Sequence, residues 1–353
     1  MILTIKKRLK ILIRERIPEF CAKSPRRAIL FYLLFDKSFL RETQAVLAGR
    51  VKHIRDSKQA KANYFLLVRN THRIEKGLLM RPRRPVFGKD YIQETIESFE
   101  RIWKAQAVEG ARNPQLKWFH DVLSEYFAAA GDADPLIAKM RERFRATVTG
   151  QPLPRSVYNG QSRSVPYFRL AEQRSSISYD EFLKLCRQRR SVRWFLNQPV
   201  PRELVDKAIV AANQAPSACN RQPFEFRIFD QSELVREGIE LPMGTKGYGH
   251  SVPVFIVLVG NLDAYFDERD RHVMYIDASL AAMSFMLALE TLGLSSCAIN
   301  WPDIESRERK MARFLKLATH QRALMCMGVG YPDPEGMVAY SEKRPLEHIR
   351  RYN

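Results

Sequence analysis

The sequence lacks the signatures of several large protein classes. Its five Cys are an odd number and none sits in a CxxC pair, so a disulfide framework is not expected. The longest uncharged apolar stretch, Ala278 to Leu289, is too short to span a bilayer, and no secretory signal is evident. With no internal repeat and 45% hydrophobic residues, the 353-residue chain predicts a globular protein of the reducing cytoplasm, long enough for two domains.

The motifs of hydrolytic and metal enzymes are missing too. Neither GxSxG nor HExxH occurs, and the Cys and His residues are not at metal-ligand spacing. His250 and His272 are far apart in the sequence and are interpreted as structural or exposed. No metal centre is therefore expected.

Positive charge is abundant, and it is unevenly distributed. Residues 1–89 hold 23 Lys and Arg against 6 Asp and Glu, a net charge of +17 out of +19 for the whole chain. This asymmetry predicts an anionic partner for the N-terminal region. Because the region shows no recognisable base-reading motif, no specific nucleic-acid partner is expected.

Residues 1–150 are predicted to form a helical region. Apolar residues at helical spacing between residues 2 and 13 predict a basic amphipathic helix, which either lies on an anionic membrane surface or docks on its own domain. Residues 27–47 predict a second helix, in which the apolar run Ala28 to Phe35 is expected to be buried. Pro and Gly residues then predict a linker over residues 151–175.

A basic turn stands out within the helical region. His72 to Leu78 mixes His, Arg, Lys and Glu, and Gly77 is expected to follow the end of a helix as its C′ residue. Arg81, Arg83 and Arg84 follow. The turn is either a solvated basic surface or an anion site for a phosphate, a phospholipid or an acidic glycan.

Residues 176–353 alternate between helix and strand patterns. Asp180 is expected to cap one helix, and Pro201 to occupy the first position of another. Strands separated by helices predict an α/β or α+β domain. The expected strands are Phe224–Phe229, Pro253–Val259, Ser296–Asn300 and Ala323–Val329, with helices over His272–Leu292 and near Ile304–Leu317.

Four segments of this second domain carry arginines, small residues and turn formers. Each alone is a weak signal, since a basic helix end or an ordinary turn would look the same. Together, and in this order, they resemble the FMN-dependent nitroreductase family. The segments are Arg189-Arg190-Ser191-Val192-Arg193, then Ala215 to Pro223, then Asp277 to Asn300, and finally Gly328 to Pro332 with Lys343 to Glu347.

This resemblance implies a fold, a cofactor and a reaction. The fold would be α+β, a dimeric nitroreductase-like domain with a mostly antiparallel central sheet flanked by helices, preceded by the all-helical region. The cofactor would be FMN, reduced by NADH or NADPH in a ping-pong hydride transfer to a small acceptor such as a nitroaromatic or a quinone. Two alternatives stay open: another flavin reaction (dehydrogenation, dehalogenation or flavin fragmentation), and a non-catalytic membrane-surface protein with a structural flavin domain.

The resemblance also assigns site residues. Arg189 and Arg344 would hold the phosphate, and Arg193 would stabilise negative charge at the N1/O2 edge of the reduced flavin. Pro216 to Asn220 would reach the flavin from the partner subunit, and the backbone near Asn300 would face N5. No residue is expected to act as a dedicated acid or base. The expected cofactor-binding residues are Arg189, Arg190, Ser191, Arg193, Pro216, Ser217, Ala218, Asn220, Gln222, Ile299, Asn300, Trp301, Lys343 and Arg344.

Three neighbouring features complete the expected site. Trp301 either shapes the substrate cavity or packs in the core. Gly244 to Gly249 is expected to be a mobile loop over the pocket, in which Lys246 is a candidate phosphate contact. Cys219 is interpreted as a small buried hydrophobe beside the cofactor.

The N-terminal extension carries a second resemblance. Its segment His72 to Leu78, followed by an Arg-rich stretch and Phe87-Gly88, is similar to nitroreductase-related proteins of bacterial polysaccharide biosynthesis. The expected location is the cytoplasm, or the inner face of the membrane if the basic helix binds lipid.

Overall fold

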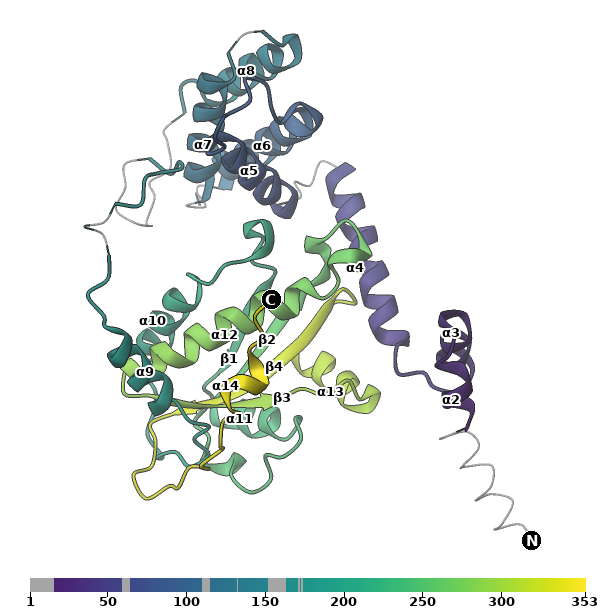
Figure 1. Cartoon of the computed structure of the whole chain (residues 1–353), viewed down its shortest axis with the longest axis vertical. Helices are drawn as coiled ribbons and strands as arrows, with labels where there is room; N and C mark the ends of the chain where they lie inside the picture. Colours follow the sequence, from purple (N-terminus) through teal and green to yellow (C-terminus); the bar gives the residue numbers. More distant parts are fainter. Residues whose placement is uncertain are drawn as a thin grey trace.

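The protein has three parts in the computed structural model: an N-terminal arm, a helical bundle and an α+β body (Figure 1). The structure describes residues 16–58, 64–109, 115–131, 133–151, 163–170, 172 and 174–353. The basic helix expected over residues 2–13 lies outside these ranges, as does most of the linker expected over 151–175.

The helical bundle has a core of its own. Four helices bury large apolar side chains against one another, among them Phe99, Phe119 and Tyr126. Asp134 caps the last helix by accepting the backbone N–H groups of Leu136 and Ile137. The bundle helices are α5 (Tyr64–Leu78), α6 (Lys89–Glu109), α7 (Gln115–Ala129) and α8 (Pro135–Val148). The all-helical character expected for this region is confirmed for the residues described.

Gly77 occupies a different position from the one expected. It lies inside α5, one residue before the end of the helix, where an added Cβ would come within 2.3 Å of the Phe87 ring. The close approach of that ring, rather than a left-handed helix end, is what requires glycine here.

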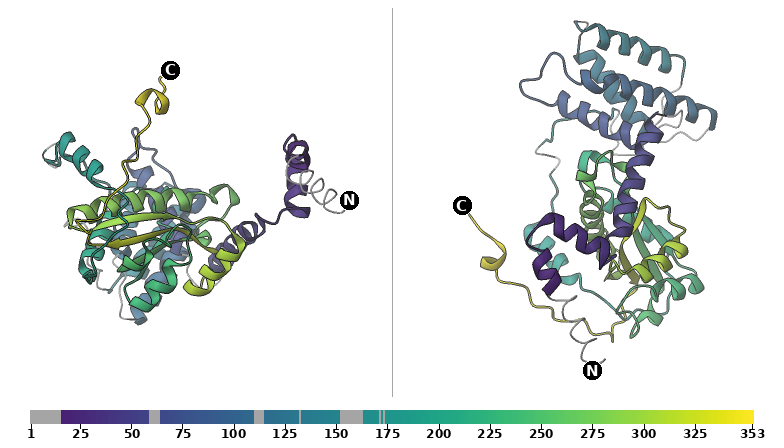
Figure 2. Two further views of the ribbon diagram at one scale, coloured as in Figure 1. Left: turned by 90° about the horizontal axis from the view of Figure 1, so that it is seen from below. Right: turned by 90° about the vertical axis from the view of Figure 1, so that its right-hand side faces the viewer.

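The apolar run of the arm is exposed, which contradicts the expected burial. The arm consists of α2 (Ile17–Cys21) and α3 (Pro25–Leu34), and neither helix has a buried residue. Apolar side chains surround α3 on several faces, and the helix stands apart from the body, so a single packed face cannot form (Figure 2). The exposed large apolar side chains are Phe20, Ile29, Leu30, Tyr32, Leu33, Leu34 and Phe35.

Helix α4 (Leu40–Lys58) packs on the α+β body instead of the bundle. Ala45 shares a small core with Leu262, Tyr265 and Met274. Gly49 allows this close contact, since an added Cβ would lie 2.6 Å from Leu262.

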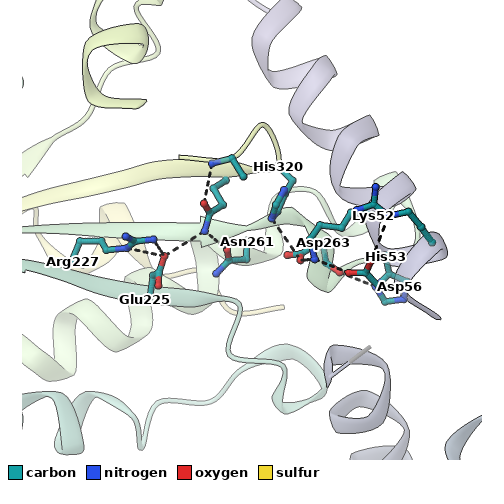
Figure 3. Close-up of polar contacts among 11 residues, drawn as sticks. Lys52, His53, Asp56, Glu225, Arg227, Asn261, Asp263 and His320 are labelled. Carbon is teal, nitrogen blue, oxygen red and sulfur yellow. Dashed lines mark hydrogen bonds and ion pairs between the residues drawn. The ribbon is translucent and has the colours of Figure 1, made fainter. Parts of the chain in front are cut away.

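A polar network fastens the end of α4 to the body (Figure 3). Lys52 Nζ lies 2.7 Å from Asp56 Oδ2 and 2.8 Å from Asp263 Oδ2. The backbone carbonyl of Asp263 is 2.8 Å from Nδ1 of His53, and its carboxylate is 3.6 Å from Nε2 of His320. Burial lowers the pKa of both imidazoles.

The body is built around a four-stranded antiparallel sheet in the order β1-β2-β4-β3. The expected α+β fold is therefore confirmed, and each expected strand is present within two residues of its predicted ends. The strands are β1 (Phe224–Phe229), β2 (Val254–Asn261), β3 (Ser295–Asn300) and β4 (Gln321–Gly330). The helices are α9 (Tyr179–Gln188), α10 (Arg202–Ala212), η3 (Ala218–Asn220), α11 (Ser232–Ile239), η4 (Gly249–Ser251), η5 (Leu262–Ala264), η6 (Glu268–Asp270), α12 (Val273–Thr291), α13 (Glu305–Leu315) and α14 (Leu346–Ile349).

Strand β2 is buried on both faces, which explains its continuous apolar sequence. Val254, Ile256 and Leu258 contribute to one core with α10 and α12, whereas Phe255 and Val257 contribute to a second core with α11 and α13. Helices thus cover both sides of the sheet.

Helix α12 is the main core helix of the body. Within the described ranges, Glu268–Thr291 is the one helical segment long and apolar enough, by length and composition, to cross a membrane. Its Ala278, Phe285 and Leu289 side chains pack against the sheet, which gives the apolar composition a structural reason.

Two helix starts differ slightly from expectation. Ser178, not Asp180, caps α9, and it forms a reciprocal capping box with Glu181. Pro201 is the N-cap of α10, one position earlier than predicted.

Candidate active site

Three of the four motif segments meet at one edge of the sheet. Ser191 forms a parallel bridge with Ser296 of β3, and the N–H of Val192 donates to the carbonyl of Ser296 at 3.1 Å. A few residues later, the N–H of Leu196 donates to the carbonyl of Tyr331 at 2.9 Å. The first segment is thereby held between the third and the fourth.

Polar atoms at this junction are left without partners inside the protein. Within the described part of the chain, Nε of Arg189 and Oγ of Ser296 are buried and have no hydrogen-bond partner. Buried polar groups are normally satisfied, so these two atoms have donor capacity that a ligand at this edge could use. A guanidinium and a hydroxyl are suitable donors for a phosphate, which is the group that the sequence analysis assigned to Arg189.

The other arginines of the first segment have different surroundings. Arg190 donates to the backbone carbonyls of Ala339 and Tyr340, so its guanidinium holds the C-terminal tail. The Arg193 side chain is exposed, and its guanidinium carbon lies 5.9 Å from the centre of the Tyr248 ring. Of the two, Arg193 is thus the more open to a ligand.

The second segment forms a strained loop that is fixed to the start of α12. Ser217 donates to Oδ2 of Asp277, which also accepts the N–H of Ala218. Asn220 and Gln222 have φ of 54° and 50°, a left-handed region that costs non-glycine residues about 1–3 kcal/mol each. Burial raises the pKa of Asp277. Pro216 and Ala218 are exposed, whereas Ser217 faces inward.

Helix α12 separates this loop from the arginine segment. The loop is bound to Asp277 near the start of the helix, while Gln188, next to Arg189, donates to Glu290 near its end. At a rise of about 1.5 Å per residue, these two carboxylates lie about 20 Å apart along the axis. A single chain therefore holds the loop and the arginine segment near opposite ends of α12, and we call these two segments the half-sites.

The end of β3 exposes one side chain of the expected set and buries two. Asn300 is exposed, whereas Ile299 and Trp301 are buried in the core. Nε1 of Trp301 donates to the carboxylate of Glu308, which also lies 3.4 Å from the Arg322 guanidinium. These contacts favour the packing interpretation of Trp301 over the cavity interpretation.

The remaining expected residues lie away from the junction. Lys343 and Arg344 are exposed in the C-terminal tail, and Arg344 donates to the carbonyl of His348 at 2.9 Å. Figure 2 shows this tail extending from the body. The structure therefore does not bring Arg344 beside Arg189 within one chain.

The glycine-rich turn, expected to be a mobile loop, alternates exposed residues with packed ones. Thr245 and Tyr248 are buried, and Thr245 donates to the carbonyl of Ile239 at 2.8 Å. Lys246 is exposed and has no contact that supports a phosphate role among the described residues.

Sequence reasoning missed the two carboxylates that position the half-sites. Asp277 and Glu290 are both buried, and burial raises the pKa of both. The sequence did hold a clue to both residues. Asp277 and Glu290 flank the longest uncharged apolar stretch of the chain, which places them at the two ends of a buried helical segment.

A separate cavity of about 290 Å³ lies beside α10, lined by Arg202, Asp230 and Val254 among others. It contains no residue of the four segments.

Comparison with known families identifies the class of protein. Residues 186–243 and 240–331 match the model of the Nitroreductase family. The match falls on the α+β body and supports the resemblance that the four segments predicted, including the expectation of a flavin oxidoreductase of the nitroreductase type. The match begins at residue 186, so it covers neither the arm nor the bundle.

Individual relatives cover about half of the chain. Iodotyrosine deiodinase 1 of Sus scrofa is 28% identical over 197 residues, which are 48% of this chain and 67% of that protein. A putative NADH dehydrogenase/NAD(P)H nitroreductase of Methanothermobacter thermautotrophicus is 26% identical over 157 residues, covering 44% and 80%. A solved structure with the same description, from Parabacteroides distasonis, is 25% identical with a TM-score of 0.43 and covers 48% and 97%.

Proposed function

We propose that the protein is a homodimeric FMN-dependent oxidoreductase that uses NADH or NADPH and has its flavin at the subunit interface. The observation that carries this proposal is the separation of the two half-sites along α12. Each half-site holds residue types that the family uses around one flavin, yet one chain keeps them about 20 Å apart. A second copy of the chain supplies the missing half.

An exposed apolar stripe on α12 supports the dimer. Ile276, Leu280 and Met283 are 57%, 44% and 40% exposed, and their spacing places them on one face of the helix. Two such stripes packed antiparallel about a two-fold axis would bring the start of one α12 to the end of the other. The loop of one subunit would then lie beside the arginine segment of its partner.

The residues of the junction fit FMN. Arg189 and Ser296 offer donors for the phosphate, and exposed Arg193 offers a cation for the ring edge that becomes negative on reduction. Bound FMN supplies two-electron redox chemistry between a nicotinamide and an acceptor. The protein's own part is to bind, to orient and to exclude water, with no dedicated acid or base.

The acceptor is proposed only as a chemical class. Nitroaromatics or quinones are the first candidates, in ping-pong turnover with the nicotinamide, and the nitroreductase-named relatives support them. Relatives named iodotyrosine deiodinase favour the alternative of another flavin reaction, reductive dehalogenation. A role in bacterial polysaccharide biosynthesis stays a prediction, as does a cytoplasmic location.

A visible absorption spectrum of the purified protein tests the proposal, followed by anaerobic addition of NADH and NADPH. We expect a flavin band that one of the nucleotides bleaches. A flavin that neither nucleotide reduces would point to another reductant. Absence of bound flavin after reconstitution with FMN would overturn the proposed function.

A membrane-surface role for the arm is a second candidate. The exposed apolar side chains of α3 stand beside Lys23, Arg26 and Arg27, and the whole region 1–89 carries a net charge of +17. Apolar side chains flanked by cations bind anionic lipid surfaces by combined burial and attraction. We propose an acidic bilayer surface as the partner of the arm.

A further inference from the structure

The N-terminal bundle touches the loop that carries one half of the flavin site. Helix α5 packs against η3, which is the Ala218–Asn220 turn of that loop. Figure 1 places α5 on the side of the bundle that faces the α+β body. An element outside the nitroreductase match therefore forms a wall next to the proposed cavity.

This wall carries arginines that continue onto the body. Arg69 and Arg73 stand one turn apart on α5 and so share a face of the helix. The guanidinium carbon of Arg73 lies 3.6 Å from the centre of the Tyr91 ring, and the guanidinium donates to Oδ1 of Asn70 at 3.4 Å. The guanidinium carbon of Arg69 lies 4.5 Å from the centre of the Phe266 ring. The guanidinium of Arg221, which directly follows η3, lies 5.2 Å from the centre of the adjacent Tyr265 ring.

Two donors in this cluster have no acceptor. Within the described part of the chain, Nε of Arg221 and the hydroxyl of Tyr265 are buried without a hydrogen-bond partner. The Arg221 side chain is only 3% exposed. Its one ion pair there is with Asp270, at 3.4 Å, and Asp270 also lies 3.9 Å from Arg269. One carboxylate thus serves two guanidinium groups.

Positive charge exceeds negative charge around Arg69. Among the residues that the structure describes, no carboxylate forms an ion pair with Arg69, and its side chain is half-buried. Burial and the charges of Arg73 and Arg221 lower the pKa of the Arg69 guanidinium, against a smaller opposing effect of Glu94. Gathering cations away from water is unfavourable unless an anion joins them.

We propose that Arg69, Arg73 and Arg221 form an anion-binding site beside the flavin cavity, which holds a carboxylate or phosphate group of the substrate. This inference rests on the proposed function, since the adjacent loop is what places the site near the flavin. It gives the bundle a role in substrate selection: the α+β body supplies the redox chemistry, and α5 selects acceptors that carry an acidic group. A guanidinium suits such groups because it offers paired donors.

Two matched probes test the proposal, 4-nitrobenzoate and its neutral analogue 4-nitrobenzamide. Their binding to the FMN-loaded protein is measured by the change in the visible flavin spectrum. We expect the carboxylate to bind at least about tenfold more tightly than the amide at low salt, with the difference shrinking as salt is added. Equal affinity of the two probes would overturn the proposal.

Variants then assign the effect to the arginines. Arg69→Gln and Arg73→Gln should each weaken 4-nitrobenzoate binding about fivefold or more and leave 4-nitrobenzamide binding unchanged. Arg84→Gln is the matched control, because it removes the same charge from an exposed position beyond α5. Loss of binding for both probes, or an equal effect of Arg84→Gln, would contradict the assignment.

A measurement without flavin separates this proposal from the proposed function. The Tm of the flavin-free protein is recorded with inorganic phosphate and with an equal ionic strength of sodium chloride. A rise with phosphate in the wild type that Arg69→Gln and Arg73→Gln both abolish would support the anion site even if FMN did not bind. The opposite outcome is that FMN binds and is reduced, but phosphate does not raise the Tm and 4-nitrobenzoate binds no more tightly than 4-nitrobenzamide. That result would overturn the anion site and leave the proposed function standing.

Discussion

Ser217 and Asp277 form a hydrogen bond of 2.6 Å that ties the loop around η3 to the first turns of α12. Oγ of Ser217 also accepts the N–H of Gln222 at 2.8 Å, so one hydroxyl connects both ends of the loop. The loop contains non-glycine residues with positive φ, and such backbone persists only where surrounding bonds hold it. The shape of this half-site therefore depends on one buried carboxylate.

Replacing Ser217 with Ala should destabilise the protein. We expect the free energy of unfolding to fall by about 1–3 kcal/mol, since Asp277 loses a donor and the N–H of Gln222 loses its acceptor. Urea unfolding followed by circular dichroism measures the change. Ser306→Ala, on the exposed first turn of α13, is the control and should stay within about 0.5 kcal/mol of the wild type. Equal stability of the two variants would show that the loop does not need this bond.

Replacing Arg189 with Gln should weaken FMN binding by at least about tenfold. A charge-assisted hydrogen bond contributes about 1.5–3 kcal/mol, and among the residues that the structure describes Nε of Arg189 has no partner to compensate. Quenching of flavin fluorescence on titration with protein gives the affinity. Arg187→Gln removes the same charge from an exposed position on α9 and should bind FMN like the wild type. If both variants retain full affinity, Arg189 is not a phosphate ligand.

A charge on the α12 stripe should abolish the dimer and, with it, flavin binding. Leu280→Glu together with Met283→Glu would bury unpaired carboxylates between two helices. We therefore expect the dissociation constant of the dimer to rise at least about hundredfold. Light scattering after size-exclusion chromatography reports the mass. Leu234→Glu, on the opposite side of the sheet, is the control. A monomeric variant that still binds FMN tightly would contradict the composite site.

Acidification should loosen α4 from the body. The pKa values of His53 and His320 are lowered by burial, whereas both imidazoles have ordinary values of about 6.5 when unfolded. Below that pH the unfolded chain binds more protons, so the free energy of unfolding falls as the pH drops from 7 to 5, by up to about 1.4 kcal/mol per pH unit for each histidine. Above pH 7 neither group contributes a pH dependence.

The charges that face these imidazoles come from several elements. Lys52, Arg69 and Arg221 oppose protonation of one or the other imidazole, and Asp263 favours it. Thermal unfolding across the pH range measures the slope, which His53→Gln should reduce. His348→Gln, in the exposed tail, should leave the slope unchanged. An unaltered slope in His53→Gln would assign the pH dependence to other groups.

The arm should bind acidic membranes. We expect the protein to sediment with vesicles that contain phosphatidylserine, not with pure phosphatidylcholine, and to be released by salt. Leu33→Glu with Leu34→Glu should reduce the bound fraction about tenfold or more, while Met337→Glu in the exposed tail should not. If the arm variant changes the dimer mass instead, the arm packs on a second copy of the chain.

Local pattern was sufficient to predict much of the body. The alternation in Phe224–Phe229 and the apolar run of β2 report strands because side chains of a strand alternate between two faces, both covered here. The arginines at the end of α9 predicted a phosphate site, whereas the structure shows that Arg190 instead donates to the backbone of the C-terminal tail. These features depend on residues that are close together in the sequence, so they can be predicted from the sequence alone.

Burial of a helix was less predictable. The apolar run of α3 has the composition of a core helix but lies exposed, because hydrophobicity does not specify whether another element lies opposite. Gly77 and Trp301 show the same limit: their roles come from Phe87 and Glu308, which pack on them from elsewhere in the chain.

The sequence by itself determined the family of the body, its strand order of appearance and the residue types of the flavin site. Only the tertiary structure decided that the loop and the arginine segment lie at opposite ends of α12, and that α5 of the bundle lies against the loop. The physical reason is that the sequence shows which residue types each motif holds and in what order the motifs come. The distance between two motifs in space depends on the length and packing of the helix that separates them.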